Sequence, residues 1–388
     1  MAHCSASSDF SGALQTLGEH DPSAAVAKAK EQLGFLDNVT LNIAVTGETG
    51  AGKSAFINAI RGLDDDEDMS APTGITETTN EVTMYTHPTK PNVKLWDLPG
   101  IGMPSLKADQ YLKTVKFETY DLFIIISSTR FKENDVFLAK EMKKKHKHFY
   151  FVRSKIDNDI NAATRSKNFD EQQVLCTIRE DCRRNLKEVG DPEVFLISSY
   201  DLGKYDFQNL IDTIESELSE QKQFALLQSL PVCSLTMLKK KKISMEKFIM
   251  LSAIVSGIGG YFSIPFVSLA FEKSVIVAFF TGCHQAFGLN EKSIEKLSER
   301  VNMPVSHLKL PIKSPFTLAL MDKNRLVPPI APTCPVTSLE NLLDMKLFGK
   351  RFQNATQAFK HTYTVLSQGL DEMVEDMTEV LRVAGLDE

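Results

Sequence analysis

The sequence has few of the features that mark a secreted, disulfide-stapled or disordered protein. Its six cysteines are scattered over 388 residues, without a CxxC pair or a Cys/His cluster at metal-binding spacing. It has only 20 glycines and 16 prolines, and 43% of its residues are hydrophobic. This composition excludes collagen-like and disordered chains, and it predicts cysteines that stay reduced.

Neither sign of charge dominates the chain. The 44 Lys and Arg residues stand against 50 Asp and Glu residues, which gives a net charge of −6. A dedicated nucleic-acid-binding protein needs a basic surface, so we expect no nucleic-acid partner. The first residues lack the apolar core of a signal peptide, and Ala2 stands where N-myristoylation requires Gly. We therefore expect a cytoplasmic chain without a secretory leader or a myristoyl anchor.

Short β-branched or aromatic runs alternate with helical patterns in the first half of the chain. The runs span residues 41–47, 81–86, 93–100, 121–128, 148–154 and 194–199, and the helical patterns follow Lys53 and span 111–118, 132–145, 167–189 and 207–218. This alternation predicts an α/β domain with a six-stranded, mostly parallel sheet and helices on both faces.

Strand patterns stop after residue 222, and the remainder reads as helical. Leu370, Met373, Val374, Met377, Val380 and Leu381 form one helical stripe, which we interpret as core-facing. We expect a helical segment over 1–37 that packs on the helical domain, a nucleotide-binding domain over 38–222 and an all-α domain over 223–388.

The run GETGAGKS, between a predicted strand and a predicted helix, fits the pattern G-x-x-x-x-G-K-[ST]. In such a loop, backbone N–H groups surround the phosphates, the lysine neutralises the β/γ oxygens and the hydroxyl ligates Mg²⁺. The predicted nucleotide-binding residues here are Gly47, Glu48, Thr49, Gly50, Ala51, Gly52, Lys53, Ser54 and Ala55.

Two further segments suit the γ-phosphate and its metal. Asp97 ends an apolar strand, where its carboxylate can reach Mg²⁺ through water, and the Gly100 N–H can approach the γ-phosphate. A polar loop, TGITETT, spans residues 73–79, and a threonine in it could ligate Mg²⁺ while the γ-phosphate is present. We favour Thr73 and keep Thr76 and Thr79 as alternatives, beside the interpretation of a plain surface loop.

A fourth segment in chain order predicts the base. Asp157, in Ser154-Lys155-Ile156-Asp157, can accept two hydrogen bonds from guanine N1–H and its exocyclic amine, which adenine cannot match. The Lys155 stem would lie along the base. Ser198 and Ser199, after the last strand, would back the base through their N–H groups. We therefore predict GTP and GDP, with Mg²⁺, as the ligands.

The ordered motifs GETGAGKS, TGITETT, DLPG, SKID and SS, together with the apolar segment IPFVSLAF, resemble the immunity-related (interferon-inducible) GTPase family. The resemblance covers nearly the whole chain, and Lys53 places it with the branch that keeps a P-loop lysine. It implies a dynamin-like GTP hydrolase with a G domain and a helical domain. It also implies GTP-dependent self-assembly and reversible, peripheral binding to intracellular membranes of the endoplasmic reticulum, Golgi or pathogen vacuole in host defence.

Hydrolysis needs a group that positions water. Small GTPases place a Gln after D-x-x-G, whereas this chain has Ile101, which cannot hydrogen-bond to water. The resemblance implies Glu77 as the catalytic glutamate, and a group from a second G domain is the alternative. We therefore expect Lys53, Thr73 and Glu77 to carry catalysis and assembly to accelerate it. The alternative function is a slow switch that recruits effector proteins.

Residues 248–271 contain no charge and follow a lysine run at residues 239–242. Their length could span a bilayer, but Gly257, Gly259, Gly260 and Pro265 near the middle favour two helices joined by a turn. We expect a buried hairpin, with a membrane-inserting or spanning segment as alternatives. The lysine run is interpreted as a solvated face or a contact with anionic lipid.

Overall fold

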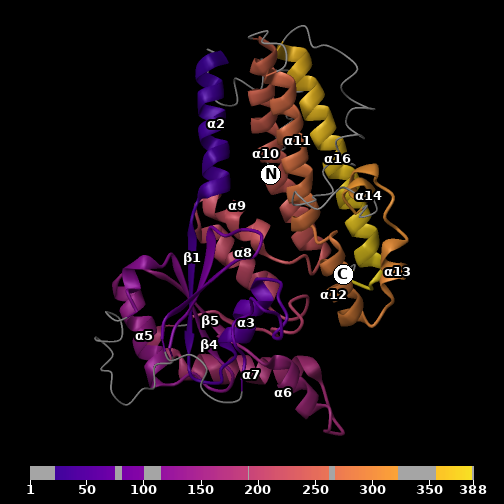
Figure 1. Ribbon diagram of the computed structural model, residues 1–388. Helices are drawn as coiled ribbons and strands as arrows, with labels where there is room; N and C mark the ends of the chain where they lie inside the picture. The colour runs from indigo at the N-terminus through magenta and orange to yellow at the C-terminus, as the bar shows by residue number, and fades with distance from the viewer. Residues whose placement is uncertain are drawn as a thin grey trace. The chain divides into compact units, whose positions relative to one another are not determined.

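The computed structural model describes residues 22–74, 81–99, 115–190, 192–261, 267–321 and 355–386. They fall into two compact units (Figure 1). One unit is Val39–Pro231, and the other contains the described parts of Met1–Asn38 and Val232–Glu388. The cysteines in the described residues, Cys176, Cys182, Cys233 and Cys283, are free thiols.

The unit Val39–Pro231 is built on a six-stranded sheet in the order β2-β3-β1-β4-β5-β6. β2 pairs antiparallel with β3, and the other neighbouring strands pair in parallel. The predicted strands and the mostly parallel sheet are confirmed. Their bounds are β1 Leu41–Gly47, β2 Thr83–Thr86, β3 Val93–Asp97, β4 Leu122–Ser127, β5 His148–Arg153 and β6 Val194–Leu196.

Burial explains why the central strands are so apolar. β4 lies between β1 and β5, and all of its residues are buried. A parallel strand covered on both faces reads as a continuous apolar run rather than an alternating one. The register pairs Val45 with Asp97 on one side and with Ile124 on the other, so the carboxyl ends of β1, β3 and β4 meet at one edge. Ligands bind at this edge of an open α/β sheet.

Helices follow most strands of this unit. They are α3 Lys53–Ile60, α5 Glu133–Lys144, α6 Ile156–Ala163, α7 Glu171–Asn185, α8 Phe207–Glu217 and α9 Glu220–Ser229, with short 3₁₀ turns at Phe117–Thr119 and Lys187–Val189. The helix expected over 111–118 is not found in its described part, where Val115 and Lys116 form a turn before the first 3₁₀ turn. Its earlier residues lie outside the described chain. α6 was not expected from the sequence.

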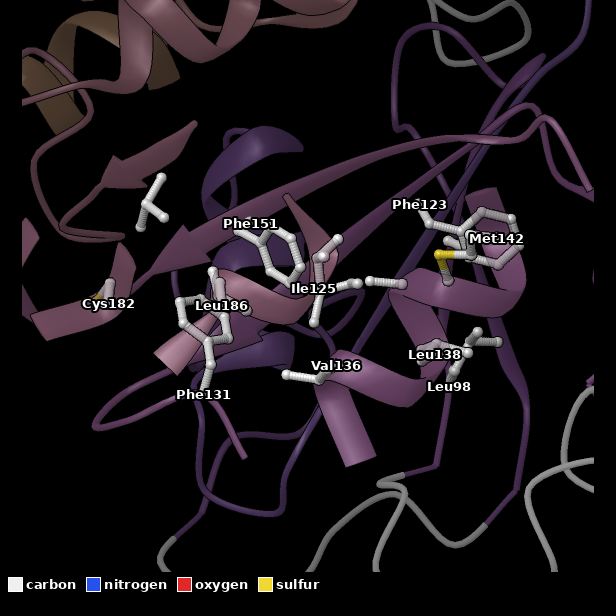
Figure 2. Packing of buried hydrophobic residues seen from close by; sticks show 14 of the residues in the cluster. Leu98, Phe123, Ile125, Phe131, Val136, Leu138, Met142, Phe151, Cys182 and Leu186 are labelled. Carbon is white, nitrogen blue, oxygen red and sulfur yellow. The ribbon is translucent and has the colours of Figure 1, made fainter. Parts of the chain in front are cut away.

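An apolar cluster joins α5 and α7 to the sheet. Figure 2 shows Val136, Leu138 and Met142 of α5 in the same cluster as Phe123 and Ile125 of β4. Phe131, just before α5, meets the ring of Phe151 on β5 edge to face, with centroids 5.0 Å apart. Edge-to-face pairs add stability beyond the apolar area they bury. This packing holds the sheet edge that carries the predicted site.

α9 extends this unit beyond residue 222, where we expected the boundary. Lys222 donates from Nζ to Asp121 Oδ1 at 2.6 Å, and Asp121 Oδ2 accepts from the Asn42 backbone N–H at 2.8 Å. Phe224 and Leu226 are buried, and α9 packs against β1 and β3. An ion pair and an apolar face therefore attach the helix to the sheet.

The second unit is helical. Its elements are α2 Pro22–Asn38, α10 Leu235–Tyr261, α11 Val267–Ala286, α12 Glu291–Val301, α13 Val305–Lys309, α14 Pro315–Met321 and α16 Ala355–Val383. α10, α11 and α16 run side by side (Figure 1), and α2 packs against α10. The stripe predicted on α16 faces the core: Val374 is half-buried and its other five members are buried.

The uncharged stretch 248–271 is divided between α10 and α11, which pack against each other, so the two expected helices are confirmed. Residues 262–266, between them, lie outside the described chain. The rings of Phe248 and Phe279 stack at 5.8 Å between the two helices. None of the helices in the described ranges combines the length and apolar character that crossing a membrane requires.

The lysine run before this stretch is not a uniformly solvated face, which corrects our interpretation. Lys241 is fully buried, and its Nζ donates to the Ala286 carbonyl at the end of α11 at 2.7 Å. Lys242 pairs with Asp371 of α16 at 2.6 Å. The helical period turns successive lysines to different sides, so part of the run binds neighbouring helices rather than solvent.

Candidate functional site

The loop after β1 is shaped by the end of the strand. Gly47 pairs with Ile126 of β4 and has a φ of +142°. A Cβ at this position would lie 2.0 Å from the Ile126 carbonyl oxygen, so no side chain fits. The chain then turns through residues 48–52, and α3 begins at Lys53 after Gly52 in a left-handed conformation. The N–H groups of the first helical turn therefore point toward the loop.

Lys53 lies inside this loop, with only 7% of its surface exposed. Its Nζ donates to the carbonyl oxygens of Gly47 at 3.2 Å and Glu48 at 3.1 Å. The Glu48 carboxylate pairs with Lys132, the residue before α5, at 2.7 Å. Hydrogen bonding to Glu48 raises the pKa of Lys132. The sequence analysis did not identify Lys132, which precedes α5.

Ser54 and Asp97 meet although they lie 43 positions apart in the chain. The Ser54 hydroxyl donates to Asp97 Oδ2 at 2.9 Å, and both residues are buried. The Leu98 N–H donates to the Val45 carbonyl at 2.9 Å and fixes the end of β3 beside β1. The structure therefore brings together two of the three predicted metal ligands. Thr73 is exposed, and in the described chain no hydrogen bond joins it to Ser54 or Asp97.

The predicted base-recognition segment is tied to the same loop. The Ser154 hydroxyl donates to the Ala51 carbonyl at 2.6 Å, and the Ser154 N–H donates to the Ser127 carbonyl at 2.9 Å. Lys155 is left-handed, with a φ of +59°, and α6 begins after it. Asp157 lies in the first turn of α6, and its Oδ1 is buried without a hydrogen-bond partner among the described residues.

The loop after β6 lies against this segment. The Ile197 N–H donates to the Arg153 carbonyl at 2.9 Å, and the Ile156 N–H donates to the Ile197 carbonyl at 3.4 Å. Ser198 is buried and Ser199 is half-buried. Hydrogen bonds therefore join the loop after β1 to the Asp157 segment, and the Asp157 segment to Ile197, the residue before the two serines.

Some predicted residues cannot be placed. Gly100, Glu77, Thr76 and Thr79 lie outside the described residues. The positions favoured for water activation, and two of the three candidate threonines, therefore stay predictions.

Asn58 is a site residue that the sequence analysis missed. It is buried on α3, and its Oδ1 accepts from the Ala71 N–H at 2.6 Å. Its Nδ2 donates to the Ala71 carbonyl and to Asp65 Oδ1, both at 2.9 Å. It thus holds the acidic segment that leads to Thr73. A single amide among the buried apolar residues of this helix is a signal that could have found it.

Comparison with known proteins identifies the chain. Residues 10–384 match the sequence pattern of the family described as interferon-inducible GTPase (IIGP). The chain belongs to the interferon-inducible GTPase family. As a member of this family it is a GTP hydrolase with a P-loop G domain, and the family predicted from the motifs is confirmed.

Several curated relatives match over most of their length. "Interferon-inducible GTPase 5" of Rattus norvegicus is 36% identical over 384 residues, covering 97% of this chain and 82% of the rat protein. "Interferon-gamma-inducible GTPase 10" of Mus musculus is 39% identical over 311 residues, covering 78% of this chain and 73% of the mouse protein. Among solved structures, Toc33 from Arabidopsis thaliana in complex with GDP and Mg²⁺ is 16% identical, with a TM-score of 0.31 over 45% of this chain and 79% of that chain.

Proposed function

We propose that this family member binds GTP with Mg²⁺ at the carboxyl edge of the sheet and hydrolyses it to GDP. One observation carries the proposal: the Ser154 hydroxyl joins the Asp157 segment to the Ala51 carbonyl of the glycine-rich loop at 2.6 Å. That bond makes the base-recognition segment and the phosphate-binding loop parts of a single site. A ligand with a purine at one end and phosphates at the other fits such a site.

The phosphate end of the site follows from the loop. Backbone N–H groups over residues 48–54 and the N-terminus of α3 favour negative charge. Lys53 is held among the carbonyls of Gly47 and Glu48, where its ammonium can exchange those contacts for β- and γ-phosphate oxygens. Buried positive charge close to the scissile bond stabilises the charge that develops during phosphoryl transfer.

The chemistry of the donor set fits Mg²⁺. Ser54 Oγ and the Asp97 carboxylate are hard oxygen donors 2.9 Å apart, of the kind that Mg²⁺ binds beside phosphates. Ser54 would ligate the ion, Asp97 would hold it through water and Thr73 would join them when the γ-phosphate is present. Bound Mg²⁺ neutralises charge on the β- and γ-phosphates.

The base end of the site depends on Asp157. Its buried Oδ1 without a described partner is costly unless a donor meets it, and guanine supplies two donors in the required geometry. Adenine has no matching pair, so this carboxylate selects guanine nucleotides. Ser198 and Ser199 would support the base from the loop after β6.

Exchanging the donor and acceptor pattern at residue 157 tests this proposal. Asp157→Asn replaces an acceptor with an amide that can donate to the C2 carbonyl of xanthine, so the preference should change from GTP to XTP by about tenfold or more. Affinities for the fluorescent guanine and xanthine nucleotides measure it, with Asp159→Asn as the matched control. If purified wild-type chain showed no saturable affinity for GTP, the proposed function would be wrong.

We further infer that GTP-dependent self-assembly accelerates hydrolysis. The support is chemical: Ile101 cannot orient water, so the positioning group must be Glu77 or come from a second G domain. A complementary group from a second chain can be worth orders of magnitude in rate, as arginine fingers are. The test of this inference is given in the Discussion.

We also propose peripheral, reversible action at intracellular membranes in interferon-linked immune defence. Membership of the interferon-inducible family supports the immune role, and the family resemblance of the motifs implies the peripheral membrane route. Alkaline carbonate extraction of a membrane fraction tests the peripheral route. Release of the protein would support it, and retention would contradict it.

A further inference from the structure

Tyr200 links two separate parts of the site. The residue is 69% exposed, and its hydroxyl donates to Asp65 Oδ2 at 3.4 Å. Its backbone N–H donates to the buried Ser198 hydroxyl oxygen at 3.3 Å. One residue therefore contacts both the loop after β6 and the acidic segment after α3.

The acidic end of this link is anchored firmly. Asn58 bonds both Asp65 and Ala71, and the Ser70 hydroxyl donates to the Asp65 carbonyl at 3.0 Å. A restraint on Asp65 is therefore passed to Ala71 through a buried amide. Ala71 stands two positions before Thr73, the threonine favoured as a metal ligand.

The other end of the link is anchored at the base site. Ser198 follows Ile197, whose carbonyl accepts from the N–H of Ile156, the residue before Asp157. Desolvation raises the pKa of Tyr200, and the negative charges of Asp65 and Asp157 raise it further. The hydroxyl thus lies within electrostatic reach of both carboxylates.

We propose that Tyr200 is a positioning residue that couples the guanine site to the segment leading to Thr73. The inference rests on the proposed function, because Asp157 must hold the base. A base bound at Asp157 restrains the loop that carries Tyr200, and the Tyr200 hydroxyl then restrains Asp65 and the chain beyond it. The coupling restrains the nucleotide at its base and at its phosphates, and it does not alter the preference between guanine and adenine.

Dissociation of a fluorescent, non-hydrolysable GTP analogue with Mg²⁺ from the full chain tests the coupling, because Thr73 is proposed to act only while the γ-phosphate is present. Tyr200→Phe removes only the hydroxyl and should speed dissociation by about threefold to tenfold, as expected for one hydrogen bond to a charged group. Asp65→Ala should speed it at least as much. The double variant should dissociate no faster than Asp65→Ala alone, because both changes break the same link. The preference for GTP over ATP should be unchanged in all three variants.

Tyr205→Phe is the matched control. Tyr205 stands in the same loop, burial raises its pKa and the charges of Glu171 and Asp157 raise it further, and no hydrogen bond joins it to Asp65 among the described residues. This variant should release the GTP analogue at the wild-type rate, and thermal unfolding without nucleotide verifies that every variant is folded. An unchanged rate in Tyr200→Phe, additive effects in the double variant, or an equal effect of Tyr205→Phe would each overturn the coupling.

The Asp157→Asn variant separates this inference from the proposed function. If Asp157→Asn prefers XTP while Tyr200→Phe releases the GTP analogue normally, only the coupling is wrong. If Asp157→Asn keeps the wild-type base preference, the assignment of the base site is wrong, and the coupling falls with it.

Discussion

At the residue scale, the site depends on a few polar contacts made where apolar strands end. Ser54 and Asp97 are buried together, and each is costly to bury alone. The hydroxyl that donates to Asp97 is also the group proposed to ligate Mg²⁺. If the proposal is right, the Ser54 hydroxyl has both a structural and a metal-binding role, which two substitutions can separate.

Ser54→Ala should remove most of the gain in nucleotide affinity that Mg²⁺ provides. In the wild type we expect Mg²⁺ to strengthen GTP-analogue binding by about tenfold or more, because the ion bridges protein oxygens and phosphates. Titrations with Mg²⁺ and with a chelator measure this gain. Ser54→Thr keeps the hydroxyl and should keep the gain. An equal Mg²⁺ effect in wild type and Ser54→Ala would refute the assigned ligand.

At the element scale, the helical unit depends on close packing of its long helices. Gly369 of α16 lies against Phe280 of α11, and a Cβ at residue 369 would lie 2.3 Å from the ring. Phe280 in turn packs on Phe316 of α14, with ring centroids 4.5 Å apart. Because Gly369 has no side chain, α16 can pack directly on Phe280, which also contacts Phe316 of α14.

Gly369→Ala should destabilise the protein by about 1–3 kcal/mol, because a well-packed core resists an added methyl group. Denaturant unfolding measures the change. Gly282→Ala, at a helical position with nothing within 4 Å of the added Cβ, should instead stabilise by about 0.5–1 kcal/mol through helix propensity. Adding Phe280→Leu should recover part of the loss in Gly369→Ala. Equal changes in unfolding free energy for Gly369→Ala and Gly282→Ala would contradict the packing argument.

The end of α11 also carries a pH-sensitive group. His284 is buried, its Nε2 has no hydrogen-bond partner among the described residues, and burial lowers its pKa to about 4. The unfolded chain protonates His284 near its ordinary pKa of 6.5, whereas the folded chain resists protonation. Between these two values the unfolded state binds more protons, so stability falls as the pH falls.

This shift predicts a loss of about 2 kcal/mol of folding free energy at pH 5 relative to neutral pH. His284→Leu should remove that part of the pH dependence between pH 6.5 and 4. Unfolding free energies at several pH values measure it, and His307→Leu, at an exposed position of α13, is the control. If His284→Leu and the wild type lost the same unfolding free energy between pH 6.5 and 4, another group would be responsible.

At the scale of the whole molecule, the proposal concerns assembly. GTP turnover per molecule should rise with protein concentration if a second chain completes the site, and it should stay constant if one chain suffices. Initial rates over a wide concentration range, with light scattering in parallel, measure both. Glu77→Ala should lower the rate at every concentration if Glu77 positions water. A rate per molecule that never changes with concentration would exclude activation by assembly.

Elements whose sequence pattern is local, such as buried strands, were predicted more accurately than elements whose formation depends on packing. The bounds of β1 agree with the predicted run, because a strand covered on both faces is made mostly of apolar and β-branched residues. α6 was missed because it is only eight residues long and begins inside the segment identified for base recognition. The helix expected over 111–118 failed in its described part because periodicity alone does not show that a short segment packs.

The sequence by itself determined the family, the α/β class and the order of the nucleotide motifs, because phosphate loops and buried parallel strands impose residue types at fixed local spacing. Only the tertiary structure decided the contacts between distant segments: Ser154 on Ala51, Ser54 on Asp97, Tyr200 on Asp65, and Lys241 buried against α11. Such contacts depend on which elements become neighbours, and no local pattern encodes the partner of a single polar side chain.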